Sequence, residues 1–436
     1  MLDDTISEKD MQKKDNFVRR KILNKSKNIK NRVKKGIITI ILGMLFGSCA
    51  ALAFVLLVPR FDSVFWGMEE NTSAPLITIP IDEETVVIGL NETEVQETEP
   101  IQEIVENAIK KNELDFEDYK NMTESLGKIA KNAEKSIVSI NASRTEVGLF
   151  DENITKSGSC AGIIVYKTSQ EILIITSRDL VMEADILDIT FEAGLSAPGI
   201  IKQSDSITNI AIVSVQSGAF ETKIADKITP IALGNSNLIS KGDAVLAIGN
   251  PSGNVYSFVH GFVSSINNNI SITDGVWSVL DIDCNALENS NSFFINLKGE
   301  LVGIGKTSAS NVSNSGFVSA MPISELKPLI EKLSNGGAKA YLGITGIDIT
   351  EAMSHSMELP KGIYIQSVIE GSPAYDSGLQ RGDVIVDISD TEILRLKDFQ
   401  TFMNAKIQGE SILVKVMRFS VDDYKELVFE VKLGSR

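Results

Sequence analysis

The sequence predicts a mostly β protein with two folded domains and one membrane-spanning helix near its N-terminus. Its 436 residues exceed the length of one ordinary domain. Short apolar segments recur between Gly, Asn and Ser through the middle of the chain, at a spacing of about ten residues that is typical of all-β barrels and sandwiches. One uncharged apolar run stands near the N-terminus, directly after a basic segment.

The membrane-spanning helix is predicted at Gly36–Val58, which is 23 residues long and has no charged side chain. At about 1.5 Å per residue, such a helix covers about 35 Å and exceeds a hydrocarbon core of roughly 30 Å. A cleaved signal peptide is less favoured, because its apolar region is only about 7–15 residues long. Arg19–Lys35 carries nine Lys or Arg and no acid. We therefore expect residues 1–35 to be a basic cytoplasmic tail and the rest to lie outside the cytoplasm, as in a single-pass protein of the cell membrane.

An acidic linker is predicted over residues 59–123. Phe61–Lys120 holds 16 acidic residues and three Lys, and it shows no sustained helical or strand period. Such a composition favours a mostly flexible spacer, with a modest helix near its end. The net charge of −16 for the chain argues against nucleic acid as a main partner.

A β domain is expected over residues 124–335. Its pattern alone fits either a barrel or a sandwich. The expected strands are Ala161–Val165, Ile172–Thr176, Ile186–Phe191, Ile210–Val215, Ala244–Ile248, Gly261–Ile266, Phe293–Asn296 and Leu301–Ile304.

Four motifs of this domain occur in a fixed order. They are SGSCAGII at Ser157–Ile164, AIGNPSG at Ala247–Gly253, NLKGELVGI at Asn296–Ile304 and GFVSAMP at Gly316–Pro322. Together they resemble the HtrA (DegP-like) family of trypsin-fold serine proteases. The resemblance implies a trypsin-like double β-barrel with the active site between the barrels, and a trimer as in the family.

Two of the family's catalytic positions are altered. Asp179, in ITSRDLV, falls where the family has its catalytic His, and Asn209, in TNIAI, falls where the family has its Asp. A serine nucleophile needs an imidazole to take its proton and a carboxylate to hold that imidazole. A carboxylate with an ordinary pKa of about 3.9 is a poor substitute for imidazole near neutral pH.

Ser290 falls at the nucleophile position, in ALENSNSFF. Glu288 stands where the family has the Gly whose N–H helps to bind the oxyanion, and Asn291 and Ser292 replace the two Gly that follow the nucleophile. The resemblance therefore implies a serine endopeptidase fold that is a pseudoprotease. The alternative is an active or weakly active endopeptidase in envelope protein quality control, using Ser290 with Asp179 or with a relocated base, His260.

Cys160 and Cys284 are the two Cys outside the apolar run. The resemblance places their segments close together, so either one disulfide or two buried free thiols is expected. No His/Cys cluster has the spacing of metal ligands, so neither a metal nor another cofactor is expected.

Residues 338–431 resemble a PDZ domain of the HtrA type. The resemblance rests on YLGI at Tyr341–Ile344 and on three later blocks, GSPA at Gly371–Ala374, SGL at Ser377–Leu379 and RGDVI at Arg381–Ile385. It implies that Tyr341, Leu342, Gly343 and Ile344 form the loop that binds a terminal carboxylate. It also implies that Leu396, Phe399 and Met403, which share one helix face, line the apolar side of the peptide groove or belong to the core.

The expected partners follow from this groove. They are peptide or protein C termini and unfolded proteins, bound outside the cytoplasm, while the assembly is a homotrimer or a mixed oligomer with an active relative. A rival interpretation makes the barrel domain a pure oligomerisation scaffold.

Overall fold

The computed structural model describes residues 76–82, 116–147, 153–192, 194–220, 227–287, 290–305 and 317–435. All of them belong to one compact unit, Ala74–Arg436. The expected membrane span at Gly36–Val58 lies outside the described residues. Within the described ranges, no helix is both long and apolar enough to cross a membrane.

The first barrel is closed, with the strand order β1-β2-β3-β6-β5-β4. Its inward side chains are mainly Ile and Val, including Ile140, Ile164 and Val213, which suit a pleated, half-buried surface. The strands are β1 (Ile137–Val147), β2 (Asn153–Lys167), β3 (Glu171–Ser177), β4 (Ile186–Phe191), β5 (Ser196–Asp205) and β6 (Ile210–Gln216).

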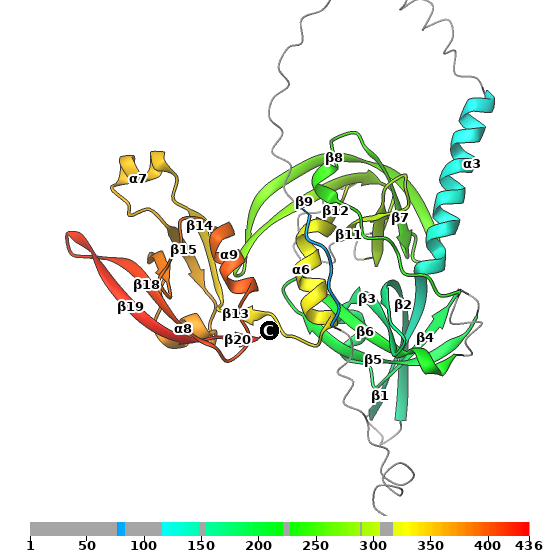
Figure 1. Ribbon diagram of the computed structural model, residues 1–436, viewed down its shortest axis with the longest axis horizontal. Coiled ribbons are helices and arrows are strands. Elements are labelled where there is room, and N and C mark those ends of the chain that lie inside the picture. Colours follow the sequence, from blue (N-terminus) through cyan, green and yellow to red (C-terminus); the bar gives the residue numbers. More distant parts are fainter. Residues whose placement is uncertain are drawn as a thin grey trace, which may run out of the picture. The chain divides into compact units, whose positions relative to one another are not determined.

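The second barrel is also closed, in the order β10-β11-β12-β9-β8-β7. One hydrophobic cluster joins both barrels, with Ile163 and Ile175 from the first packed in the same core as Phe293 and Ile330. This architecture confirms the expected trypsin-like double barrel (Figure 1). The strands are β7 (Ala244–Gly249), β8 (Ser257–Ile272), β9 (Gly275–Cys284), β10 (Ser292–Ile295), β11 (Leu301–Gly305) and β12 (Phe317–Pro322).

Helices frame the barrels. Two of them lie at the ends of the domain, α3 (Phe116–Ala133) before it and α6 (Ile323–Ser334) after it. The short helices are α4 (Arg178–Val181), η1 (Glu134–Ser136), η2 (Ser217–Ala219) and η3 (Ser236–Leu238).

Residues 76–82 differ from the expected flexible spacer, because they pack beside α6 (blue trace in Figure 1). Ile77 and Ile79 are 2% and 7% exposed, and both belong to the barrel core cluster. Their N–H groups donate to Asn335 Oδ1 at 2.9 Å and to Glu331 Oε2 at 2.6 Å. The spacer interpretation therefore does not hold for these seven residues.

The C-terminal domain is a PDZ domain built on a sheet ordered β14-β15-β16-β18-β19, so that β14 is an edge strand. Strand β17 (Thr391–Glu392) adds to β16, and β13 (Ala340–Tyr341) pairs with β20 (Gly434–Ser435). The other elements are β14 (Ile344–Asp348), α7 (Glu351–Met357), β15 (Ile363–Val368), α8 (Pro373–Ser377), β16 (Val384–Ile388), α9 (Leu396–Asn404), β18 (Ser411–Ser420) and β19 (Asp423–Lys432).

Candidate functional site

Asp179 lies in α4, directly after β3, with its side chain turned to solvent. The side chain is 71% exposed, and its Oδ1 lies 3.6 Å from the Arg178 guanidinium. Within the described residues, no hydrogen bond joins this carboxylate to Ser290. The group at the base position is therefore an exposed carboxylate paired with its own neighbour.

Asn209 holds the start of α4 in place. Its backbone lies in the left-handed region, at a φ of 58°, which Asn tolerates better than most residues. Its Oδ1 accepts from the Asp179 N–H at 2.9 Å, and its Nδ2 donates to Ser177 Oγ at 3.0 Å. The amide thus caps a helix turn that would otherwise carry an unpaired N–H.

Ser290 has another hydroxyl as its hydrogen-bond partner. Its Oγ lies 2.7 Å from Ser292 Oγ, and its carbonyl accepts from the Ser292 N–H at 2.9 Å. A serine hydroxyl does not take up a proton near neutral pH, so this contact does not activate the nucleophile.

Asn291 ties the Ser290 loop to the first barrel. It is 6% exposed, and its Nδ2 donates to the Ala161 carbonyl at 2.6 Å and to Thr176 Oγ1 at 2.8 Å. Its own carbonyl accepts from the Asn250 N–H at 3.0 Å. The side chain that replaces a family Gly therefore bridges β2 and β3, while the backbone carbonyl of the same residue holds the AIGNPSG turn. The sequence alone did not indicate this role.

A further candidate, His260, does not join Ser290. His260, on β8 opposite Leu246, is exposed, and no hydrogen bond among the described residues links it to Ser290. Glu288 lies outside the described residues.

Cys160 and Cys284 are both buried and free, so the structure has the two buried thiols and not the disulfide. Cys160 Sγ lies 3.6 Å from Thr176 Oγ1. Burial raises the pKa of each thiol, which disfavours the reactive thiolate. No cluster of three or more His, Cys, Asp or Glu that could hold a metal occurs among the described residues.

The predicted carboxylate-binding loop, Tyr341–Ile344, runs from β13 into β14. Gly343 has a φ of 93°, and an added Cβ would collide with Ser372, so only Gly fits here. The helix residues Leu396, Phe399 and Met403 lie on α9 and are buried in the same core as Leu342 and Ile344. The structure therefore brings the loop and the apolar face of the helix together.

The N–H groups of this loop already have a partner. Asp274, in the turn between β8 and β9, accepts hydrogen bonds from Leu342, Gly343 and Ile344 through its carboxylate. The sequence did not indicate a role for Asp274. It is the second residue of the two-residue turn between Ile272 and Gly275, and no local pattern shows what the tip of a hairpin contacts.

Comparison with known proteins agrees with this architecture. A family model of the trypsin-like peptidase domain matches residues 160–304, and one of the PDZ domain matches residues 340–433. The chain is 30% identical over 305 residues to the serine protease Do-like HtrA of Bacillus subtilis, covering 65% of each chain. This chain is an HtrA-like protein. This HtrA-like chain is also 29% identical over 280 residues to the serine protease Do-like HtrB of Bacillus subtilis, covering 59% of each chain.

A third relative is the probable periplasmic serine endoprotease DegP-like of Rickettsia conorii, which is 28% identical over 272 residues, or 60% of this chain and 51% of the relative. The HtrA-like chain thus spans less than two thirds of the length of these relatives. Among solved structures, the HtrA-type protease AlgW with a decapeptide covers 71% of this chain and 98% of its own, with a TM-score of 0.51 at 20% identity. That likeness shows the fold alone.

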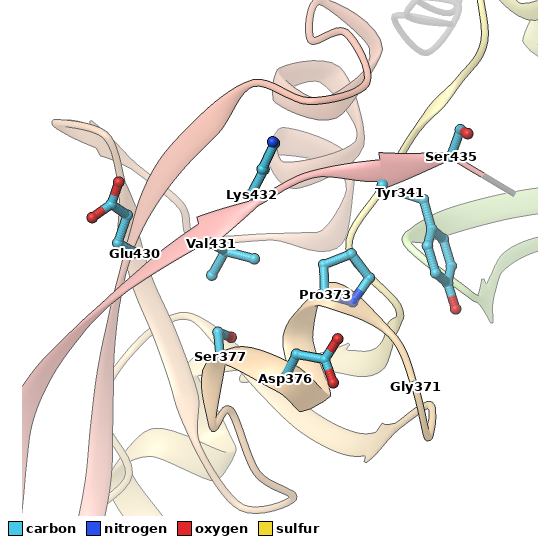
Figure 2. A pocket seen from close by; sticks show the side chains of 10 residues that line it. Tyr341, Gly371, Pro373, Asp376, Ser377, Glu430, Val431, Lys432 and Ser435 are labelled. Atoms are coloured by element: carbon cyan, nitrogen blue, oxygen red, sulfur yellow. The ribbon is translucent and has the colours of Figure 1, made fainter.

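A separate pocket of about 470 Å³ lies on the PDZ domain of the HtrA-like chain, between α8 and the last strands (Figure 2). Asp376 and Ser377 line it from α8, and Glu430 and Lys432 line it from β19. Tyr341, at the start of the predicted carboxylate-binding loop, also lines this pocket, whereas β14 and α9, the expected walls of the peptide groove, do not. The mixed charges of the pocket define no ligand.

Proposed function

We propose that this chain is a membrane-anchored, catalytically inactive HtrA-like protein. In this proposal its PDZ domain binds exposed C termini and unfolded segments of proteins outside the cytoplasm. The observation that carries the proposal is the environment of Ser290, whose hydroxyl is paired with Ser292 instead of with a base.

The other two triad positions support inactivity. Asp179 is turned to solvent beside Arg178, and the Asn209 amide is used to cap α4. In serine proteases, a nucleophile without its general base keeps only the modest rate that binding and the oxyanion hole supply. The barrel domain therefore retains its fold without the groups that would activate Ser290.

Membrane anchoring is supported by the apolar run at Gly36–Val58 and by the basic segment before it. One relative is named as periplasmic.

The proposal includes assembly as a homotrimer or as a mixed oligomer with an active relative. Sedimentation analysis of the detergent-solubilised chain tests this assembly. A chain that sediments as a monomer, both alone and together with an active relative, would contradict the proposed assembly.

A second candidate is a working serine endopeptidase, which the retained hydroxyl of Ser290 and the protease names of the relatives favour. A fluorescent fluorophosphonate probe separates the two candidates, because it reacts with an activated serine and not with an ordinary one.

We expect the full chain to label no more than its Ser290→Ala variant, while the Do-like HtrA of Bacillus subtilis serves as the labelling reference. Labelling of the wild-type chain that disappears in Ser290→Ala would establish the endopeptidase instead.

A further inference from the structure

We propose that the β8–β9 hairpin of the second barrel is an internal ligand of the PDZ groove, with the Asp274 carboxylate in the place of a peptide's C-terminal carboxylate. The inference rests on the proposed function, in which that groove receives C termini. It adds that an external peptide must first displace a segment of the same chain.

Both oxygens of the Asp274 carboxylate accept hydrogen bonds from the N–H groups of the loop. Leu342 N–H donates to Asp274 Oδ2 at 2.8 Å, Gly343 N–H donates to both oxygens at 2.8 and 2.9 Å, and Ile344 N–H donates to Oδ1 at 2.9 Å. Three consecutive N–H groups thus enclose both oxygens of one carboxylate. PDZ domains receive a terminal carboxylate in this way.

The hairpin backbone also follows the edge of the sheet. The Asp274 N–H donates to the Ile344 carbonyl at 2.8 Å, and the Ser271 hydroxyl donates to the Gly346 carbonyl at 2.6 Å. Strand β14 pairs with β15 on one side only, so its other edge is the one that a peptide strand would occupy. The hairpin therefore makes hydrogen bonds to β14 carbonyls that a bound peptide strand would otherwise use.

The opposite wall of the groove is occupied by the next part of the hairpin. The Val276 N–H donates to Gln400 Oε1 on α9 at 3.1 Å. The Val276 side chain packs against the PDZ core cluster that contains Leu342 and Phe399. An apolar side chain at this place corresponds to the last side chain of a bound peptide.

The burial of Asp274 indicates that the loop, and not solvent, stabilises its charge. The residue is 1% exposed. Burial raises the pKa of its carboxyl, while the three loop N–H groups and the Lys339 ammonium act to lower that pKa. A buried carboxylate needs such partners, because leaving it unpaired is costly.

Asp274 also has a role in its turn, which the test must separate from the role in the groove. It is the second residue of the two-residue turn, and its φ of 57° lies in the left-handed region that Asp adopts more readily than most residues. Gly and Asn both tolerate this backbone conformation, so Asp274→Gly and Asp274→Asn remove the charge and keep the turn. Asp283→Asn, which removes an exposed carboxylate from β9 of the same hairpin, is the matched control.

The experiment measures peptide binding by fluorescence anisotropy on the full chain. The probe is a fluorescein-labelled octapeptide ending in Ser-Ile-Thr-Val with a free carboxyl group, and the same peptide with a C-terminal amide is the reference. We expect Asp274→Gly to lower the Kd at least tenfold, Asp274→Asn to lower it less and Asp283→Asn to leave it unchanged. Equal Kd values for the wild-type chain and Asp274→Gly would overturn the inference and leave C-terminus recognition standing.

Hydrogen exchange without any peptide provides the second arm. We expect the amides of Leu342, Gly343 and Ile344 to exchange at least tenfold faster in Asp274→Gly than in the wild-type chain. Unchanged exchange would also overturn the inference. Faster exchange in a variant that binds neither peptide would support the internal ligand and refute the proposed C-terminus recognition.

Discussion

The Ser290 loop is held in this chain by side chains that a glycine loop lacks. Asn291 bridges the two barrels, and Asn209 caps α4. The residue types at these positions could be matched to the family from the sequence. Their hydrogen bonds could not, because Asn has a donor and an acceptor and its partners come from distant parts of the chain.

Truncation of Asn291 tests its bridging role. Asn291→Ala leaves the Ala161 carbonyl and Thr176 Oγ1 without this buried donor, so we expect a loss of about 1–3 kcal/mol in the free energy of unfolding. Urea denaturation measures the loss. Asn237→Ala, at an exposed position, is the control and should change stability by less than about 0.5 kcal/mol.

The packing of residues 76–82 against the barrel domain was not predicted from the sequence. In this segment Ile77 and Ile79 alternate with Thr78 and Pro80, as in a half-buried strand, whereas Ile81 is 71% exposed. The acidic, Pro-containing context favoured a flexible linker instead. The residues that bind this segment lie far along the chain. Asn335 is 258 residues from Ile77, and Glu331 on α6 is 252 residues from Ile79. No local sequence pattern therefore reveals the contact.

An ion pair between Lys327 and Asp82 anchors this segment. Lys327, with a side chain that is 5% exposed, donates to Asp82 Oδ2 at 2.7 Å. Asp82→Asn leaves a buried ammonium without its counter-charge, so we expect a loss of about 3 kcal/mol in the free energy of unfolding.

A double variant separates the pair from simple packing. Asp82→Leu combined with Lys327→Met removes both charges and should recover most of the loss. Glu117→Gln, which removes one partner of an exposed pair with Lys120, should change stability by less than about 1 kcal/mol. A loss in the double variant as large as that in Asp82→Asn would contradict the account.

For the whole molecule, we propose that the chain combines a barrel domain without an activated serine and a PDZ domain whose groove is filled by the β8–β9 hairpin. The motifs predicted both folds. They did not predict the contact between the domains, because Asp274 and Gly343 are separated by 69 residues and each motif describes only its own domain.

The proposed membrane anchor is tested by fractionation. We expect the full chain to stay with the membrane pellet after alkaline carbonate extraction, because a 23-residue apolar helix inserts stably. Deletion of residues 36–58 should move the chain to the soluble fraction. Carbonate release of the full chain would contradict the proposed anchor.

We propose that the barrel domain has kept its fold and lost its catalysis. The most direct measurement is the rate at which the full chain hydrolyses quenched-fluorescent unfolded casein, compared with Ser290→Ala at equal concentration. We predict equal rates for the two proteins, because Ser292 offers Ser290 no general base. A wild-type rate that exceeds the rate of Ser290→Ala would contradict the claim and establish a working endopeptidase.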